Sequence, residues 1–119
     1  MIKPIQIKDS NVLRALMEKP YHPTLLDIVV WIADTYGVCI TEGHREALHS
    51  GDVHNTDPCR AMDLRYWFYS PDLARAICDN INCRWEYDSK RPDMRVAIIH
   101  NSGKGIHFHI QVHTNTKRR

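Results

Sequence analysis

Apolar residues recur at helical spacing in three parts of the chain. Residues 10–18 have the composition of a short helix, and Ser10 stands where an N-cap residue is expected. Residues 23–36 form a longer apolar stripe that begins with proline and ends before glycine, as helices commonly do. Residues 70–81 begin with Ser-Pro-Asp, a combination typical of a helix start. The sequence therefore predicts three helices.

Short apolar or alternating runs between and after these helices predict strands. The predicted strands lie at residues 38–41, 60–67, 84–88, 95–100 and 106–112. Residues 102–105 read Ser-Gly-Lys-Gly, a plausible hairpin turn between the last two strands. Helices followed by neighbouring strands indicate an α+β fold. We expect a single domain over residues 1–119, with a small antiparallel sheet and the N-terminal helices packed on one side.

The last predicted strand alternates strictly between apolar and polar residues. One face would carry Ile106, Phe108, Ile110 and Val112 toward a core, and the other would carry His107, His109, Gln111 and His113. A turn at residues 102–105 would also place His100 opposite His107 across the hairpin. This histidine-rich face is either an ordinary solvated surface or a functional patch.

Charge and apolar content argue against two classes of binding partner, nucleic acids and membranes. The net charge of +2 is too small to indicate nucleic-acid binding, so we expect no nucleic-acid partner. No stretch approaches the roughly 18 apolar residues of a membrane span, and the N-terminus does not resemble a secretory signal. We therefore expect no association with membranes. We also expect that the protein is synthesised in the cytoplasm. Of the eight histidines, seven lie at or after His44 and outside the predicted helices, which hints at metal or acid–base chemistry.

A polar segment from residue 42 to residue 58 separates two predicted strands. It has no apolar periodicity, and so long an irregular segment in a small domain is usually functional or disordered. In the next strand Asp63 stands between apolar residues, and a carboxylate in that setting needs a polar or metal partner. A paired structural carboxylate is the simpler interpretation of Asp63.

Four motifs within residues 38–113 carry a family resemblance. They are the turn at residues 40–45 (Ile-Thr-Glu-Gly-His-Arg), His54, residues 60–64 (Arg-Ala-Met-Asp-Leu) and residues 109–112 (His-Ile-Gln-Val). Their order resembles that of the zinc D-alanyl-D-alanine metallopeptidases. This family includes peptidoglycan-cutting phage endolysins and shares its fold with the hedgehog signalling domain.

The resemblance implies a zinc site and a hydrolytic activity. The ligands would be His54, Asp63 and His109, a donor set that suits Zn²⁺ and leaves a fourth position for water. Metal-activated water would hydrolyse a bond in peptidoglycan stem peptides, as a carboxypeptidase or as an endolysin-type endopeptidase. Arg45 resembles the family arginine that recognises the substrate carboxylate or carbonyl. We expect a monomer. For an endolysin, the resemblance also implies phage origin and release to the cell wall through a separate pore.

The chain departs from the family pattern at several positions. His54 and Asp63 are nine residues apart instead of seven, Asp52 replaces a serine, and Cys59 replaces a glycine. The glutamate that often serves as general base is replaced by Ile106. His107 is our first candidate for that base, and His100 and Glu86 are weaker ones.

Two other functions are compatible with the same residues. The loss of the glutamate favours a catalytically inactive, hedgehog-like zinc-binding module. The sequence Ile106-His107-Phe108-His109 also fits the short motif of the His-hydrophobic-His nicking endonucleases. Those enzymes usually need a tyrosine on a following helix, and only ten residues without a tyrosine follow His109.

Overall fold

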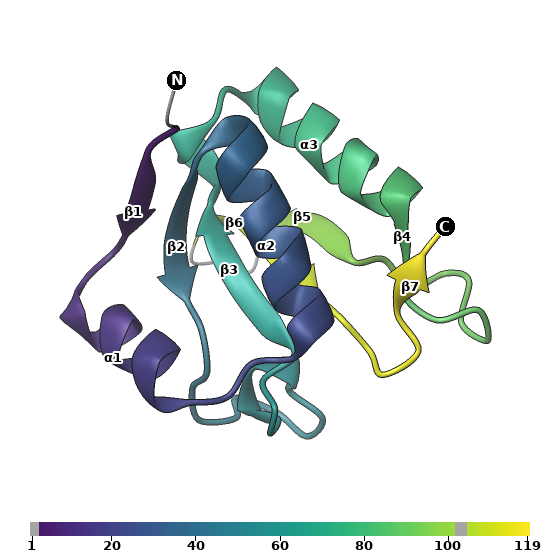
Figure 1. The fold of residues 1–119 in the computed structure, drawn as a ribbon, viewed down its shortest axis with the longest axis horizontal. Coiled ribbons are helices and arrows are strands. Elements are labelled where there is room, and N and C mark those ends of the chain that lie inside the picture. Colours follow the sequence, from purple (N-terminus) through teal and green to yellow (C-terminus); the bar gives the residue numbers. More distant parts are fainter. Residues whose placement is uncertain (1–2, 102–104) are drawn as a thin grey trace.

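The computed structural model describes residues 3–101 and 105–119, and its main feature is a five-stranded sheet (Figure 1). The strands of this sheet are β1 (Ile5–Ile7), β2 (Val38–Glu42), β3 (Ala61–Arg65), β5 (Ala97–Asn101) and β6 (Ile106–Gln111). The described helices are α1 (Ser10–Glu18), α2 (Pro23–Tyr36) and α3 (Pro71–Arg84). Two 3₁₀ turns, η1 (Val53–Asn55) and η2 (Tyr66–Phe68), and a small sheet of β4 (Trp85–Glu86) and β7 (Lys117–Arg118) complete these elements.

The main sheet has the strand order β1-β2-β3-β6-β5. β1 runs parallel to β2, and the other neighbouring strands are antiparallel. In the register of β3 and β6, Leu64 lies opposite Phe108 and Asp63 lies opposite His109. Because side chains alternate along a strand, these two pairs point to opposite faces of the sheet.

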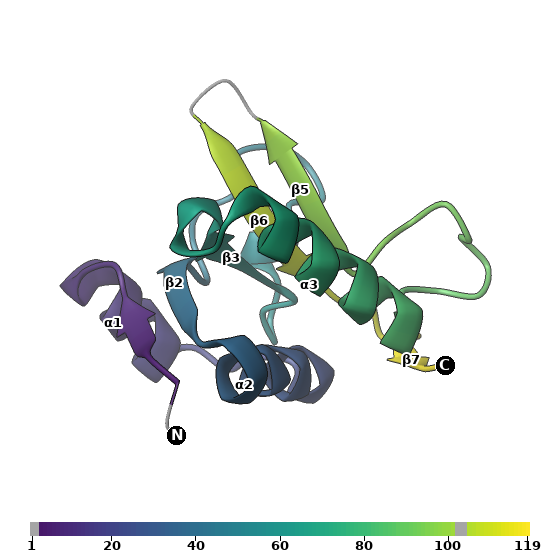
Figure 2. The same cartoon turned by 90° about the horizontal axis from the view of Figure 1, so that it is seen from above.

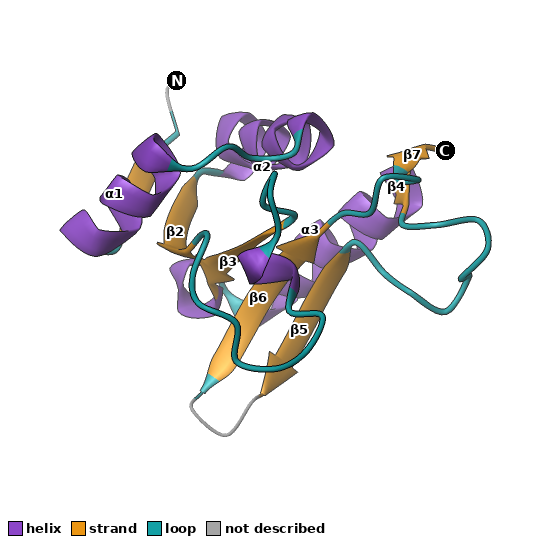
Figure 3. Cartoon of the chain, turned by 90° about the horizontal axis from the view of Figure 1, so that it is seen from below, coloured by secondary structure: helices purple, strands orange, loops and turns teal. Residues whose placement is uncertain are grey.

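One face of the sheet packs against helices and the other supports a long loop. Buried apolar side chains of α2 and α3, such as Ile28 and Ile77, form one core with Leu64 and Phe108. Both helices lie on this same side of the strands in Figures 1 and 2. Seen from below, the segment between β2 and β3 crosses in front of β3, β6 and β5, with α3 behind them (Figure 3). The polar faces of β3 and β6 are therefore covered by this loop.

The predicted α+β class is confirmed, and the predicted bounds of α1 and α2 agree with the structure. The cap of α1 was assigned one residue too late, because the side chain of Asp9 accepts a hydrogen bond from the N–H of Val12 (3.0 Å). Ser70 caps α3 as predicted, and the helix continues to Arg84. Among the described residues no helix is both long and apolar enough to cross a lipid bilayer.

The strand predictions are correct in place but differ in extent. The strand predicted at 60–67 ends at Arg65, where η2 begins. The strand predicted at 84–88 is reduced to two residues, which pair with β7 outside the main sheet. Most of the turn predicted at 102–105 lies outside the described residues. Ile106 was expected in the core but is 46% exposed, because it lies at the hairpin end of β6.

Candidate metal centre

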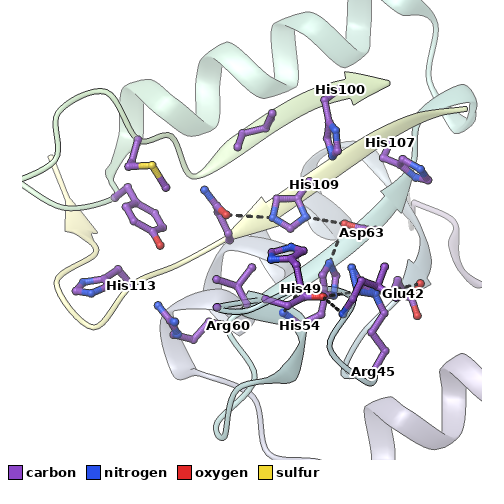
Figure 4. Close-up of a pocket in the computed structure, with 18 of the residues that line it drawn as sticks. Glu42, Arg45, His49, His54, Arg60, Asp63, His100, His107, His109 and His113 are labelled. Atoms are coloured by element: carbon purple, nitrogen blue, oxygen red, sulfur yellow. Dashed lines mark hydrogen bonds and ion pairs between the residues drawn. The ribbon is translucent and has the colours of Figure 1, made fainter. Parts of the chain in front are cut away.

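His54, Asp63 and His109 meet on the loop-covered face of the sheet (Figure 4). One ligand atom from each residue lies within 4.8 Å of the others. Asp63 Oδ1 is 2.8 Å from His109 Nδ1 and 3.2 Å from His54 Nε2. The structure therefore brings together the three residues predicted as ligands, and this group could hold a metal ion.

Two separate parts of the fold position these ligands. Asp63 and His109 are direct cross-strand partners, so the register of β3 and β6 fixes their separation. His54 lies in η1 and is fully buried (1% exposed). The carboxylate of Asp52 caps η1, because its Oδ1 accepts a hydrogen bond from the N–H of His54 (3.0 Å).

Asp52 also anchors the rest of the loop. Its Oδ2 accepts hydrogen bonds from the N–H of Leu48 (3.0 Å) and from Arg45 Nη1 (3.2 Å). Burial raises the pKa of Asp52, but the N–H groups of Leu48 and His54 and the nearby guanidinium outweigh burial, so this pKa lies below its ordinary value. Asp52 is therefore an ionised, buried anchor that holds the loop over the ligands.

The ring of His54 is oriented by a backbone carbonyl. Its Nδ1 lies 2.8 Å from the carbonyl oxygen of Gly43. A carbonyl oxygen only accepts hydrogen bonds, so Nδ1 must carry the proton that it donates. In the neutral ring, Nε2 is then unprotonated, and its lone pair faces Asp63.

The ring of His109 is oriented in the same manner by Gln111. The side-chain amide nitrogen of Gln111 donates to the carbonyl oxygen of Arg95 (2.9 Å), which directs its Oε1 toward His109. His109 Nε2 lies 3.1 Å from this Oε1 and must therefore donate to it. In the neutral ring, the lone pair of Nδ1 then faces Asp63 at 2.8 Å.

These orientations produce a convergence of electron-pair donors. Burial raises the pKa of Asp63, but hydrogen bonds that His109 and His54 donate when their facing nitrogens carry protons, together with the charge of those protonated rings, outweigh burial and hold this pKa well below its ordinary value. An ionised carboxylate and two imidazole lone pairs repel one another unless protons or a cation lie between them. Metal-binding histidines usually donate their other ring N–H to an outer acceptor such as a backbone carbonyl, as His54 does here, and the Gln111 amide oxygen takes that place for His109.

The three residues lie in a cleft of about 910 Å³ between the loop and the sheet. His100 and His107 also line this cleft, and so do Arg45, Glu42 and several other side chains (Figure 4). The predicted cross-strand pairing of His100 with His107 is confirmed by the register of β5 and β6, and their ring centroids are 5.8 Å apart. Both residues predicted to act in catalysis, Arg45 and His107, thus share the cleft with the ligands.

Other candidates lie elsewhere. Glu86 is on β4, outside the cleft lining, and its Oε2 lies 3.6 Å from Arg119 Nη1. This position does not support a role for Glu86 as the base. Ile106 is likewise outside the cleft lining. Two cleft residues, Glu42 and His49, had no assigned role, although Glu42 is the cross-strand neighbour of Asp63.

Sequence analysis also missed the residues that orient the ligands. Gln111 was placed on the same strand face as His109, and this two-residue spacing was the available signal for their contact. An aspartate two residues before His54 was an available signal for an N-cap. His54 contacts the backbone carbonyl of Gly43, so no side chain in the sequence could have indicated this contact.

Comparisons with known proteins assign neither a family nor a function to this chain. No protein-family model, no curated protein and no solved structure matches the chain.

Proposed function

We propose that this protein is a zinc-dependent peptidase that hydrolyses peptidoglycan stem peptides. The observation that carries the proposal is that one potential ligand atom each from His54, Asp63 and His109 lies within 4.8 Å of the others beside an open cleft. Three protein ligands leave a coordination position for water, as in catalytic zinc sites, whereas structural sites usually have four. The substrate class is supported by the resemblance of the motifs to zinc D-alanyl-D-alanine metallopeptidases.

The donor set fits zinc. Two imidazoles and one carboxylate form a borderline ligand set that suits Zn²⁺. The ring centroids of His54 and His109 are 5.2 Å apart, close to the separation of about 5 Å expected for two imidazoles on one tetrahedral ion with Zn–N bonds of about 2.1 Å. When bound, zinc would lower the pKa of a water molecule and polarise a carbonyl group.

Two further side chains of the cleft would serve the reaction. His107 would accept and return the proton of the attacking water, the role that a glutamate has in the resembling family. Arg45 would bind the carbonyl or terminal carboxylate of the substrate. Its described contacts use Nη1 with Asp52 and Nε with Glu42, so the donors on Nη2 can serve a substrate.

Two contrasting functions would use the same cleft differently. A hedgehog-like module would keep the metal and lack hydrolysis, an alternative favoured by Ile106 at the glutamate position. A nicking endonuclease would bind its metal through His107 and His109, without Asp63. The contacts of Asp63 with both His54 and His109 support the peptidase ligand set over that one.

The first experiment measures metal content. The protein is purified, loaded with Zn²⁺, dialysed and assayed by mass spectrometry of the metal, together with the variants Asp63→Asn and His109→Ala. We expect close to one tightly held equivalent in the wild type and loss of this equivalent in both variants. His44→Ala is the matched control, because the His44 side chain is not part of the cleft lining. Equal zinc retention by all variants would refute the ligand assignment.

The second experiment tests hydrolysis. Zinc-loaded protein is incubated with purified muropeptides that end in D-alanyl-D-alanine, and the products are identified by mass spectrometry. Release of D-alanine would support a carboxypeptidase, and cleavage within the stem would support an endopeptidase. Stable zinc binding without any cleavage would reject the peptidase and support the hedgehog-like module. His107→Ala should retain zinc and lose most of the turnover if His107 carries the proton.

A further inference from the structure

A second pair of histidines lies beside the candidate metal centre. His100 on β5 and His107 on β6 are direct cross-strand partners. Their rings have centroids 5.8 Å apart and planes inclined by 46°. Both line the cleft, and Figure 4 shows the pair on the two adjacent strands next to His109. The pair therefore presents two imidazoles to one accessible space.

The geometry of this pair is close to that of a bidentate metal ligand. Two imidazoles on one tetrahedral ion have centroids about 5 Å apart, given metal–nitrogen bonds of about 2.1 Å. The His54–His109 pair, which belongs to the proposed zinc site, has 5.2 Å between centroids. His100 and His107 exceed that value by less than 1 Å, which small side-chain rotations can supply because His100 is exposed.

The pair is distinct from the first site. The centroid of His100 is only 6.2 Å from that of His109, with the two rings edge to face. However, His109 Nδ1 faces Asp63 and His109 Nε2 contacts Gln111, so both of its nitrogens are engaged. His109 therefore has no nitrogen for a second ion, and an ion at His100 and His107 would complete its coordination with water.

We propose that His100 and His107 form a second, weaker site for a borderline divalent transition-metal ion, such as Zn²⁺, Cu²⁺ or Ni²⁺. Imidazole is a suitable ligand for all three ions. Two protein ligands bind more weakly than the three of the first site, so this site fills only in metal excess. If the proposed function holds, occupation of this site takes up the lone pair with which His107 accepts a proton. Excess metal would then inhibit the enzyme that the first equivalent activates.

Equilibrium dialysis against Zn²⁺ alone tests the site without any activity assay. The metal-free wild type should bind two equivalents, the second with a Kd at least tenfold higher. His100→Ala should lose the weaker equivalent and keep the tighter one. His54→Ala should lose the tighter equivalent and keep the weaker one. The control His44→Ala should keep both. Circular dichroism of each metal-free variant verifies that it is folded.

The possible failures are distinguishable. One equivalent in the wild type, or two in folded His100→Ala, would overturn the second site while the first remains supported by His54→Ala. An unchanged tight equivalent in His54→Ala would instead overturn the first site and the proposed function. His100→Ala decides the second site because His100 is the exposed half of the pair, so its replacement is expected to leave the fold intact.

Discussion

Replacement of Gln111 by leucine tests whether the orientation of His109 controls metal affinity. Gln111 is 6% exposed and joins two groups: its Oε1 contacts His109 Nε2 (3.1 Å), and its amide nitrogen donates to the Arg95 carbonyl (2.9 Å). Leucine is similar in size but leaves the His109 N–H without its acceptor in a place where little water can replace it. Loss of such an outer partner typically weakens metal binding about 10- to 100-fold. This range corresponds to about 1.4–2.7 kcal/mol of binding free energy.

The measurement is a competition titration in which a chelator of known affinity and the protein share limiting Zn²⁺. We expect the Kd of Gln111→Leu to rise about 10- to 100-fold. Gln6→Leu is the matched control, because Gln6 is exposed on β1 and should leave the Kd unchanged. Chemical denaturation of the metal-free proteins separates a loss of affinity from a loss of folding. An unchanged Kd in folded Gln111→Leu would refute the view that this amide fixes the ligand tautomer.

Four further substitutions test one anchor of the site and three positions elsewhere in the fold. Asp52→Asn should lower the free energy of unfolding by about 1–3 kcal/mol at pH 7 in urea titrations, because the amide cannot keep all three hydrogen bonds. Since folding lowers the pKa of Asp52, its contribution is present above about pH 4 and fades as the pH falls through the lower folded pKa. The wild type and variant should then converge in acid, and a constant difference would contradict the assignment. Tyr69→Phe should cost about 1 kcal/mol through the lost bond to the Gly37 carbonyl and leave the zinc Kd unchanged. Gly37→Ala should cost about 1–3 kcal/mol, because its φ of 80° and ψ of 169° lie in a region that essentially only glycine adopts, and its Cβ would also lie 2.8 Å from the Pro4 carbonyl oxygen. Gly51→Ala, with a similar φ but nothing within 4 Å, should cost less, and equal losses would refute the role of the clash.

The sequence correctly predicts those parts of the fold in which one physical signal dominates. The bounds of α1 and α2 followed from apolar periodicity and from proline and glycine at the ends. The alternation in β6 correctly separated His109 from the buried Phe108. β1 had no such signal, because it has three residues, and Ile5 is 61% exposed. Its parallel pairing with β2 joins segments separated by α1 and α2, a contact that local patterns do not encode.

The candidate site shows the same division between local and long-range information. Ligand residue types can be recognised in a sequence because few side chains bind zinc. The direction in which each ring points depends on hydrogen-bond partners that have little or no sequence signal. For His54 the partner is the carbonyl of Gly43, eleven residues away, which any residue type could supply.

The same reasoning explains why the unusual ligand spacing does not separate the ligands. His54 and Asp63 are nine positions apart, two more than in the pattern of the resembling family, yet their side chains meet at 3.2 Å. Each end of this connection is fixed independently: Asp52 and the Gly43 carbonyl hold His54, and pairing with β6 holds Asp63. The hydroxyl of Thr56 also ties the loop to itself, accepting from the N–H of Arg60 and donating to the carbonyl of Val53. Because these anchors fix both ends of the connection, the length of the loop between them does not set the distance between His54 and Asp63.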